Sequence, residues 1–97
     1  MTDYQPRITS LKTRLSVLEK TFKNKEAREL LLWGPRNRLN EVETYLLPEA
    51  QKSKPPEIWL RFVDLYLEWA DKDLAYAEGK LREYGPSLQI IGPDPLP

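Results

Sequence analysis

The stretch Glu57–Tyr84 decides the fold of this 97-residue chain and reads EIWLRFVDLYLEWADKDLAYAEGKLREY. Apolar residues recur in it at alternating spacings of three and four, which is the period of one face of an α-helix. They are Leu60, Val63, Leu67, Ala70, Leu74, Ala77, Leu81 and Tyr84. Gly85–Pro86 follows, as is typical after the C-terminus of a helix. The sequence therefore predicts one unbroken helix, on the order of 40 Å long.

This helix has more apolar surface than one neighbouring helix would cover. Beside the aliphatic row runs a second row of large side chains, namely Trp59, Phe62, Tyr66, Trp69 and Tyr76. Together the two rows span roughly 160° of the helix surface, whereas packing on one neighbour needs about 100°. Two neighbours in a three-helix bundle would cover much of the excess. The alternative is a second chain, because Trp and Tyr dominate interface hot spots. We expect the five residues to bind a protein partner.

A first amphipathic helix is predicted after Pro6, a residue that suits the first turn of a helix. Its apolar face consists of Ile8, Leu11, Leu15, Leu18 and Phe22. Asn24 followed by Glu26 is a possible start for another helix, so residues 7–33 form either one helix or two. Gly34–Pro35 then predicts a corner, because glycine suits a helix C-terminus and proline the next first turn.

A second helix after this corner would turn Leu39, Val42 and Leu46 inward, and Pro48 would end it or bend it. Residues 51–56 are the clearest loop in the chain, because their consecutive prolines cannot continue a helix. The prediction is an all-α, three-helix antiparallel bundle with a long C-terminal helix, forming a single domain over residues 1–86. Residues 87–97 are expected to be an extended, flexible, proline-rich tail. Two alternatives for it are a docking segment and a return of Leu88, Ile90 and Ile91 onto the bundle.

The amino-acid composition excludes several classes of function. The chain contains no cysteine and no histidine, which removes disulfides, zinc knuckles, thiol catalysis and the commonest general base and metal ligand. We therefore expect no enzyme, no catalytic residues, no metal and no cofactor. The N-terminal residues lack the apolar core of a signal peptide. No stretch of about 18 residues is free of charge, so we expect a cytoplasmic protein with no membrane partner.

Charge is unevenly distributed along the chain. Residues 1–54 hold eleven Lys and Arg against seven Asp and Glu, whereas residues 55–97 hold four against eight. Either the two halves pack together with complementary charges, or the basic half binds an anionic partner. The second possibility points to nucleic acid, with Trp33 near the arginines as a stacking platform. Its contact residues would be Arg36, Arg38, Lys12 and Lys20.

Acidic residues also occur in pairs three apart, at Glu26 and Glu29 and again at Glu68 and Asp71. Carboxylates at this spacing share a helix face and can present two oxygen ligands to Mg²⁺. The E-x-x-E followed by E-x-x-D is similar to the motif of the MazG-type all-α nucleotide pyrophosphohydrolases, over these four positions. The resemblance implies Mg²⁺-dependent hydrolysis of a nucleoside triphosphate.

The hypotheses can be ranked. The first is a non-catalytic helical interaction module, such as an adaptor or a small regulatory or assembly subunit. It would bind itself as a homodimer, or a heterologous protein, through the aromatic row. The second is a nucleic-acid- or nucleoprotein-associated protein that uses the basic half. The third is the pyrophosphohydrolase.

Overall fold

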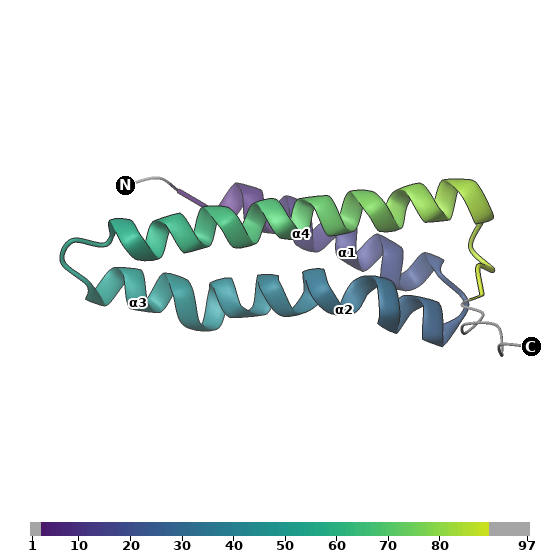
Figure 1. Cartoon of the computed structure of the whole chain (residues 1–97), viewed down its shortest axis with the longest axis horizontal. Helices are drawn as coiled ribbons and strands as arrows, with labels where there is room; N and C mark the ends of the chain where they lie inside the picture. Colours follow the sequence, from purple (N-terminus) through teal and green to yellow (C-terminus); the bar gives the residue numbers. More distant parts are fainter. Residues whose placement is uncertain (1–2, 90–97) are drawn as a thin grey trace, which may run out of the picture.

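The computed structural model describes residues 3–89, and the regular elements in this part of the chain are all helical. They are α1 (Gln5–Thr21), α2 (Lys25–Glu41), the five-residue π-helix η1 (Val42–Leu46), α3 (Leu47–Lys52) and α4 (Glu57–Tyr84), shown in Figure 1. The predicted all-α class is confirmed. None of these helices combines the length and the apolar character that crossing a membrane requires.

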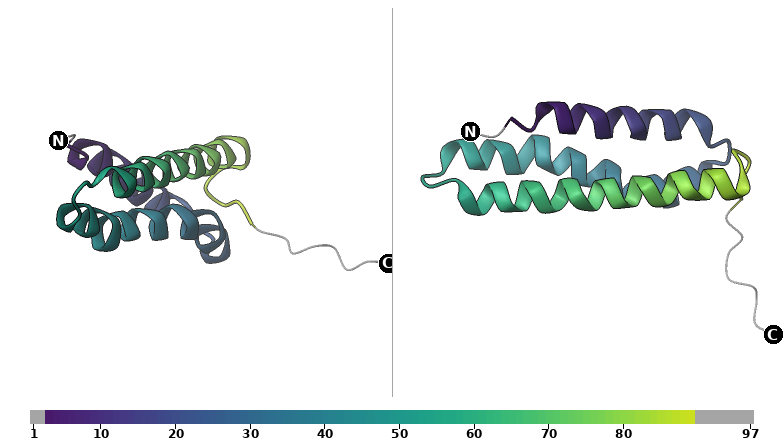
Figure 2. Two further views of the ribbon diagram at one scale, coloured as in Figure 1. Left: turned by 60° about the vertical axis from the view of Figure 1, so that its left-hand side comes forward. Right: turned by 90° about the horizontal axis from the view of Figure 1, so that it is seen from above.

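The chain runs along the length of the molecule three times (Figure 1). After α1, the segments α2, η1 and α3 follow one another without a loop and return as one rod, and α4 then runs back beside that rod. α1, α2 and α4 all contact one another, and α4 packs more extensively on α2 than on α1. Figure 2 shows α1 on one side of the layer formed by α2 and α4. Within residues 3–89, no helix covers the other side of that layer.

The core lies where the three rods meet, and its α4 side is the aliphatic row that the sequence predicts. Val63, Leu67, Ala70, Leu74 and Ala77 are fully buried, and Leu60 and Leu81 are partly buried against them. Tyr84, which belongs to the same row, is exposed at the end of the helix. The α1 contribution also follows the predicted face, from Ile8 to Phe22.

Residues 7–33 form two helices. The backbone is extended at Phe22, which closes α1, and again at Asn24, which precedes α2. The Asn24 side chain accepts a hydrogen bond from the Ala27 backbone N–H at 3.0 Å, so it satisfies one of the free donors at the start of α2. This cap favours a new helix over a continuation of α1.

The predicted corner at Gly34–Pro35 is wrong, because α2 continues through it to Glu41. A proline disfavours the helical conformation of the preceding residue through a clash with its Cβ and N–H, and Gly34 has no Cβ. The missing Pro35 donor leaves one helical hydrogen bond unmade. The continuous helix in return buries Pro35 itself, together with Leu32 and Leu39 on either side of it.

Pro48 does not end the second rod, since α3 extends to Lys52. In a regular α-helix its ring would clash with the carbonyl of Thr44, four residues earlier. The wider turn η1 includes Thr44 and ends at Leu46, two residues before this proline, so the hydrogen-bond ladder is widened where the clash would occur. The inward positions Val42 and Leu46 remain buried.

α4 ends just before Gly85, whose φ of +82° lies in the positive region that glycine adopts more readily than other residues. The backbone N–H of Lys23 donates to the carbonyl of Pro86 at 2.8 Å, which ties this turn to the α1–α2 connection. Leu88 is half-buried and packs against the core. Ile90, Ile91 and the rest of the expected tail lie outside the described residues.

Candidate protein-interaction surface

The structure divides the five predicted aromatic residues into two groups. Trp59 and Tyr66 are half-buried and pack against the core, on the side of α4 that faces η1 and α2. Phe62, Trp69 and Tyr76 are exposed. The division arises because Trp59 and Tyr66 lie seven residues apart in one column of the helix, next to the buried row, whereas the other three are rotated further from it.

The aromatic side chains on α4 contact one another and neighbouring side chains of η1 and α2. The ring of Trp59 meets the Tyr45 ring edge-on at a centroid distance of 5.8 Å and lies 6.4 Å from Phe62. The rings of Tyr66 and Trp69 are 5.6 Å apart, and the guanidinium group of Arg38 lies 4.7 Å from the centre of the Trp69 ring. Such contacts each contribute about 0.5–1.5 kcal/mol. They favour the observed orientations of the Phe62 and Trp69 rings.

Two exposed residues of this surface were not predicted. Ile58 and Leu65 are 63% and 36% exposed, beside Phe62 at 42% and Trp69 at 39%. The four residues follow one another at spacings of four, three and four, so they form a single apolar stripe on the face of α4 away from its core. We call these four residues the α4 stripe. Their spacing is visible in the sequence, but Ile58 and Leu65 are aliphatic, so the aromatic row does not include them.

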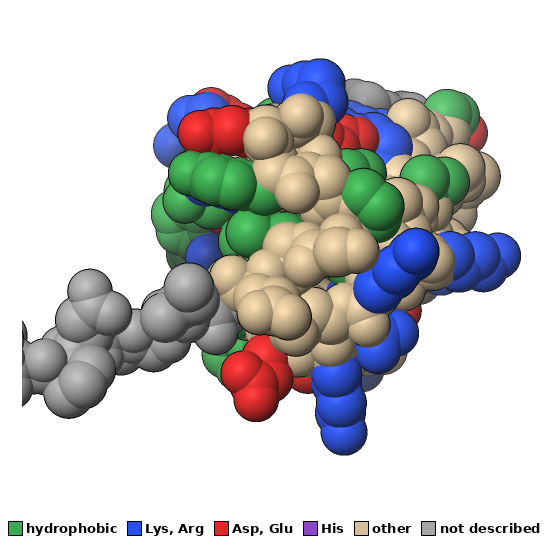
Figure 3. All heavy atoms as spheres, turned by 90° about the vertical axis from the view of Figure 1, so that its right-hand side faces the viewer, with side chains coloured by type: hydrophobic (Ala, Val, Ile, Leu, Met, Phe, Trp, Pro, Cys, Tyr) green, Lys and Arg blue, Asp and Glu red, His purple; other side chains and the backbone are tan. Residues whose placement is uncertain are grey.

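Tyr76, two turns beyond Trp69 in the same helix column, also lines a groove between α2 and α4. Two adjoining cavities, of about 370 and 280 Å³, share Leu30, Leu31 and Tyr76 in their lining. Trp33 lines the first cavity, and Tyr84 and Leu88 line the second. We call these six residues the α2–α4 groove. Figure 3 shows hydrophobic side chains gathered on one side of this end of the molecule.

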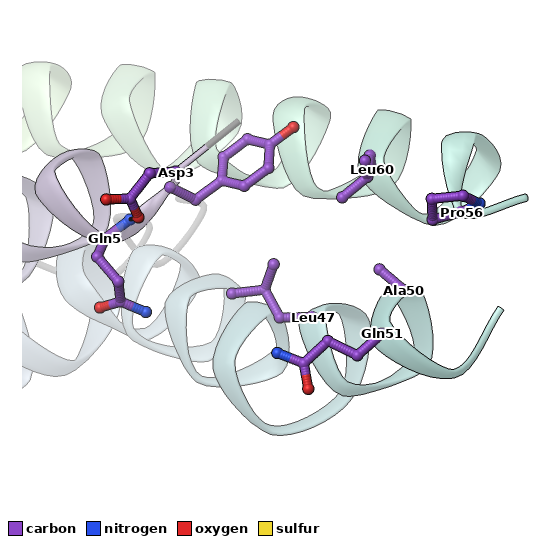
Figure 4. Close-up of a pocket in the computed structure, with 8 residues that line it drawn as sticks. Asp3, Gln5, Leu47, Ala50, Gln51, Pro56 and Leu60 are labelled. Atoms are coloured by element: carbon purple, nitrogen blue, oxygen red, sulfur yellow. Dashed lines mark hydrogen bonds between the residues drawn. The ribbon is translucent and has the colours of Figure 1, made fainter. Parts of the chain in front are cut away.

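A third concave site lies at the opposite end, between the start of α1, α3 and the start of α4, and has a volume of about 170 Å³. Leu47 and Ala50 of α3 face Leu60 and Pro56 across it (Figure 4). Its polar lining comes from Asp3, Tyr4, Gln5 and Gln51. Asp3 already accepts a hydrogen bond from the backbone N–H of Gln5 at 3.0 Å. The lining offers apolar contacts and no pairing of a nucleophile with a base.

Ion pairs join the basic half of the chain to the acidic half. Arg7 pairs with Asp64 at 3.4 Å, and Arg38 with Asp73 at 3.3 Å. Arg14 pairs with both Asp71 and Glu78. Its hydrogen bonds raise the pKa of Arg14 above its ordinary value, because they favour the charged form. The bonds to Glu78 have the larger effect, and the bond to Asp71 the smaller. Complementary packing therefore accounts for much of the charge asymmetry.

Three of the four residues considered for nucleic-acid contact take part in ion pairs. Lys12 lies 3.0 Å from Glu43, Arg36 lies 3.4 Å from Glu29 and 3.8 Å from Glu19, and Arg38 pairs with Asp73 as described above. Lys20 is exposed in the last turn of α1. A phosphate group would have to compete with carboxylates at three of these positions.

The two acid pairs are not brought together. Glu26 and Glu29 lie on α2, and Glu68 and Asp71 on α4. Glu68 is paired with Lys72 at 3.1 Å, Asp71 with Arg14, and Glu29 with Arg36. Among residues 3–89, no group of three or more acidic side chains is placed to hold a metal ion.

Comparison with protein-family models, curated proteins and solved structures finds no match for this chain. The candidate sites for a function are therefore the surfaces described above. The most distinctive of them is the α4 stripe, because four large apolar side chains there remain in water on one face of a single helix.

Proposed function

We propose that the chain is a three-helix antiparallel bundle that acts as a non-catalytic interaction module, an adaptor or a small regulatory or assembly subunit. The α4 stripe binds its protein partner. The observation that carries this proposal is the run Ile58, Phe62, Leu65 and Trp69, whose members are all exposed on one face of one helix. A packed helix that keeps such a row in water has an unused face for another helix or groove.

Burial of the stripe supplies the driving force. Complete burial of a side chain of this size stabilises an association by about 1.5–3 kcal/mol, and between a third and two thirds of each of these side chains is still accessible. Trp69 is held between Tyr66 and Arg38 before any partner arrives. Binding therefore costs little side-chain entropy at this residue.

Charged residues on the edge of the stripe set the orientation of the partner. Arg61 and Glu68 are both exposed and lie seven residues apart, in one column beside the stripe. Opposite charges at the rim of an interface favour one docking direction over its reverse.

The proposal is tested by native mass spectrometry of the full chain isolated from its own host. We expect a complex, composed of copies of this chain or of this chain with another protein. A Phe62→Ser, Trp69→Ser double variant should lose that complex and keep its helical circular dichroism. The matched control is Val17→Ser, which removes an exposed apolar side chain from α1 and should leave the complex intact.

Two results would contradict the proposal. One is a wild-type chain that is monomeric when isolated from its host. The other is a complex that survives the double variant unchanged, because the stripe would then lie outside the contact surface.

A further inference from the structure

The α4 stripe is complementary to itself when one copy is reversed. Its spacings of four, three and four read the same in both directions, so a second stripe running antiparallel matches it at every position. Ile58 then faces Trp69 of the other copy, and Phe62 faces Leu65, each contact occurring twice about a two-fold axis. We infer that the partner of the α4 stripe is a second copy of this chain, docked antiparallel along the first half of α4. The inference rests on the proposed function of the stripe.

The side chains fit this arrangement in size and spacing. The four residues occupy alternating seam positions of a seven-residue repeat, which is the repeat that lets two helices interlock side chains along their length. Each layer pairs a ring with an aliphatic side chain, Trp69 with Ile58 and Phe62 with Leu65. No charged residue lies within the seam between Ile58 and Trp69.

The charges select the antiparallel direction. Arg61 and Glu68 occupy equivalent positions of consecutive repeats on the same edge of the stripe. In an antiparallel pair each Arg61 faces Glu68 of the other copy, so two attractive contacts form. In a parallel pair the residue facing Arg61 would be Tyr66, and this attraction would be absent. Both charged side chains are exposed, and among residues 3–89 the one ion pair of Glu68 is with Lys72 one turn away, a pair that contributes little.

The opposite edge of the stripe is aromatic. Trp59 and Tyr66 are also seven residues apart, on the edge that faces η1 and α2. Antiparallel docking places Trp59 of one copy beside Tyr66 of the other, again twice. This gives a role to the two half-buried members of the aromatic row, whose rings are already oriented by Tyr45 and Trp69.

The inference is tested with charge-reversal variants of the full chain, whose self-association is measured by sedimentation equilibrium. Arg61→Glu and Glu68→Arg should each weaken self-association about tenfold or more, because attraction becomes repulsion at two symmetric positions. The Arg61→Glu, Glu68→Arg double variant should recover wild-type association to within about threefold. An equimolar mixture of the two single variants should form a mixed dimer, since the two kinds of chain then carry opposite charges at both positions.

Arg82→Glu is the matched control. Arg82 is exposed and lies in the same helix column as Arg61 and Glu68, two repeats beyond the seam. Its reversal changes the net charge as much as Arg61→Glu does and should leave association unchanged. Circular dichroism confirms that each variant is folded, which is expected because every substituted side chain is exposed.

Three outcomes would overturn the inference. They are a wild-type chain that stays monomeric up to hundreds of micromolar, single reversals without effect, and a double reversal that fails to restore association. If the chain is monomeric but a heterologous complex depends on Phe62 and Trp69, the proposed function holds and only the second copy is excluded. If neither the charge reversals nor the Phe62→Ser, Trp69→Ser variant affects any complex, both proposals fail.

Discussion

The guanidinium group of Arg14 on α1 donates two hydrogen bonds to the carboxylate of Glu78 on α4, from Nε to Oε2 at 3.1 Å and from Nη2 to Oε1 at 2.7 Å. Asp71, two turns earlier on α4, accepts from the same guanidinium group. Arg14 thus contacts two points along α4 with one planar side chain, which fixes how far α1 can slide along it.

Replacing Arg14 with Ala should lower the free energy of unfolding by about 1.5 kcal/mol, because charge-assisted hydrogen bonds at a partly buried site are lost. In thermal denaturation this corresponds to a fall in Tm of about 5–10 °C. Arg7→Ala is the control, since the Arg7–Asp64 pair is longer and more exposed, and it should cost less than about 0.5 kcal/mol. Equal losses in the two variants would contradict the role given to Arg14.

The two glycines inside helices should respond differently to alanine. A Cβ at Gly79 would meet only the end of Arg82 at 3.8 Å, whereas one at Gly34 would lie 3.2 Å from Oδ2 of Asp73, whose carboxylate is held by Arg38. Gly79→Ala should therefore stabilise the chain by about 0.5–1 kcal/mol through helix propensity. Gly34→Ala should gain less or be destabilising, because it also places a Cβ before Pro35. Chemical denaturation compares them, and an equal gain at both positions would refute the close approach at Gly34.

The contribution of the Asn24 cap to the stability of the chain should be measurable. Removing its side-chain acceptor by Asn24→Ala leaves the Ala27 N–H without its partner and should cost about 1 kcal/mol of unfolding free energy. Asn40→Ala provides the comparison, because Asn40 is an exposed residue within the same helix, where alanine is the better helix former. It should be neutral or slightly stabilising. A similar effect at both positions would mean that the cap adds nothing to stability.

Ionisation of Tyr4 should lower the stability of the folded chain at alkaline pH. Burial and then the negative charge of Asp64 raise the pKa of Tyr4 above its ordinary value of 10.0, because both disfavour the phenolate. The folded chain therefore holds this proton more tightly than the unfolded chain. The resulting stabilisation is complete below the unfolded pKa and is lost as the pH rises through the folded pKa. The melting temperature of the wild type should consequently decrease more steeply above about pH 10 than that of the Tyr4→Phe variant. Parallel pH profiles would contradict this.

The aliphatic core of α4 could be predicted from the sequence because its signal is local. A row from Val63 to Ala77 with helical spacing has one explanation, which is a buried helix face. The corner at Gly34–Pro35 could not be judged in the same way. Whether a proline inside a helix is tolerated depends on what the continuous helix buries, and here Leu32, Pro35 and Leu39 are all buried.

The proposed interaction surface can be predicted from the sequence only in part, for a similar reason. Periodicity identifies the columns of α4 but not the side on which α2 lies, so it could not separate half-buried Trp59 and Tyr66 from exposed Phe62 and Trp69. The α2–α4 groove has no local signature at all. Leu30 and Tyr76 are 46 positions apart in the printed sequence and meet only once α2 and α4 are packed.

A dimer formed through the α4 stripe would place its two α2–α4 grooves far apart. The stripe occupies the first half of α4, whereas Tyr76 and Tyr84 of the groove lie in the second half. Two chains joined antiparallel through their stripes would therefore carry their grooves at opposite ends, roughly 50 Å apart at 1.5 Å per helical residue. Such a pair is bivalent. A ligand with two apolar segments at that separation would bind with an avidity that neither groove provides alone.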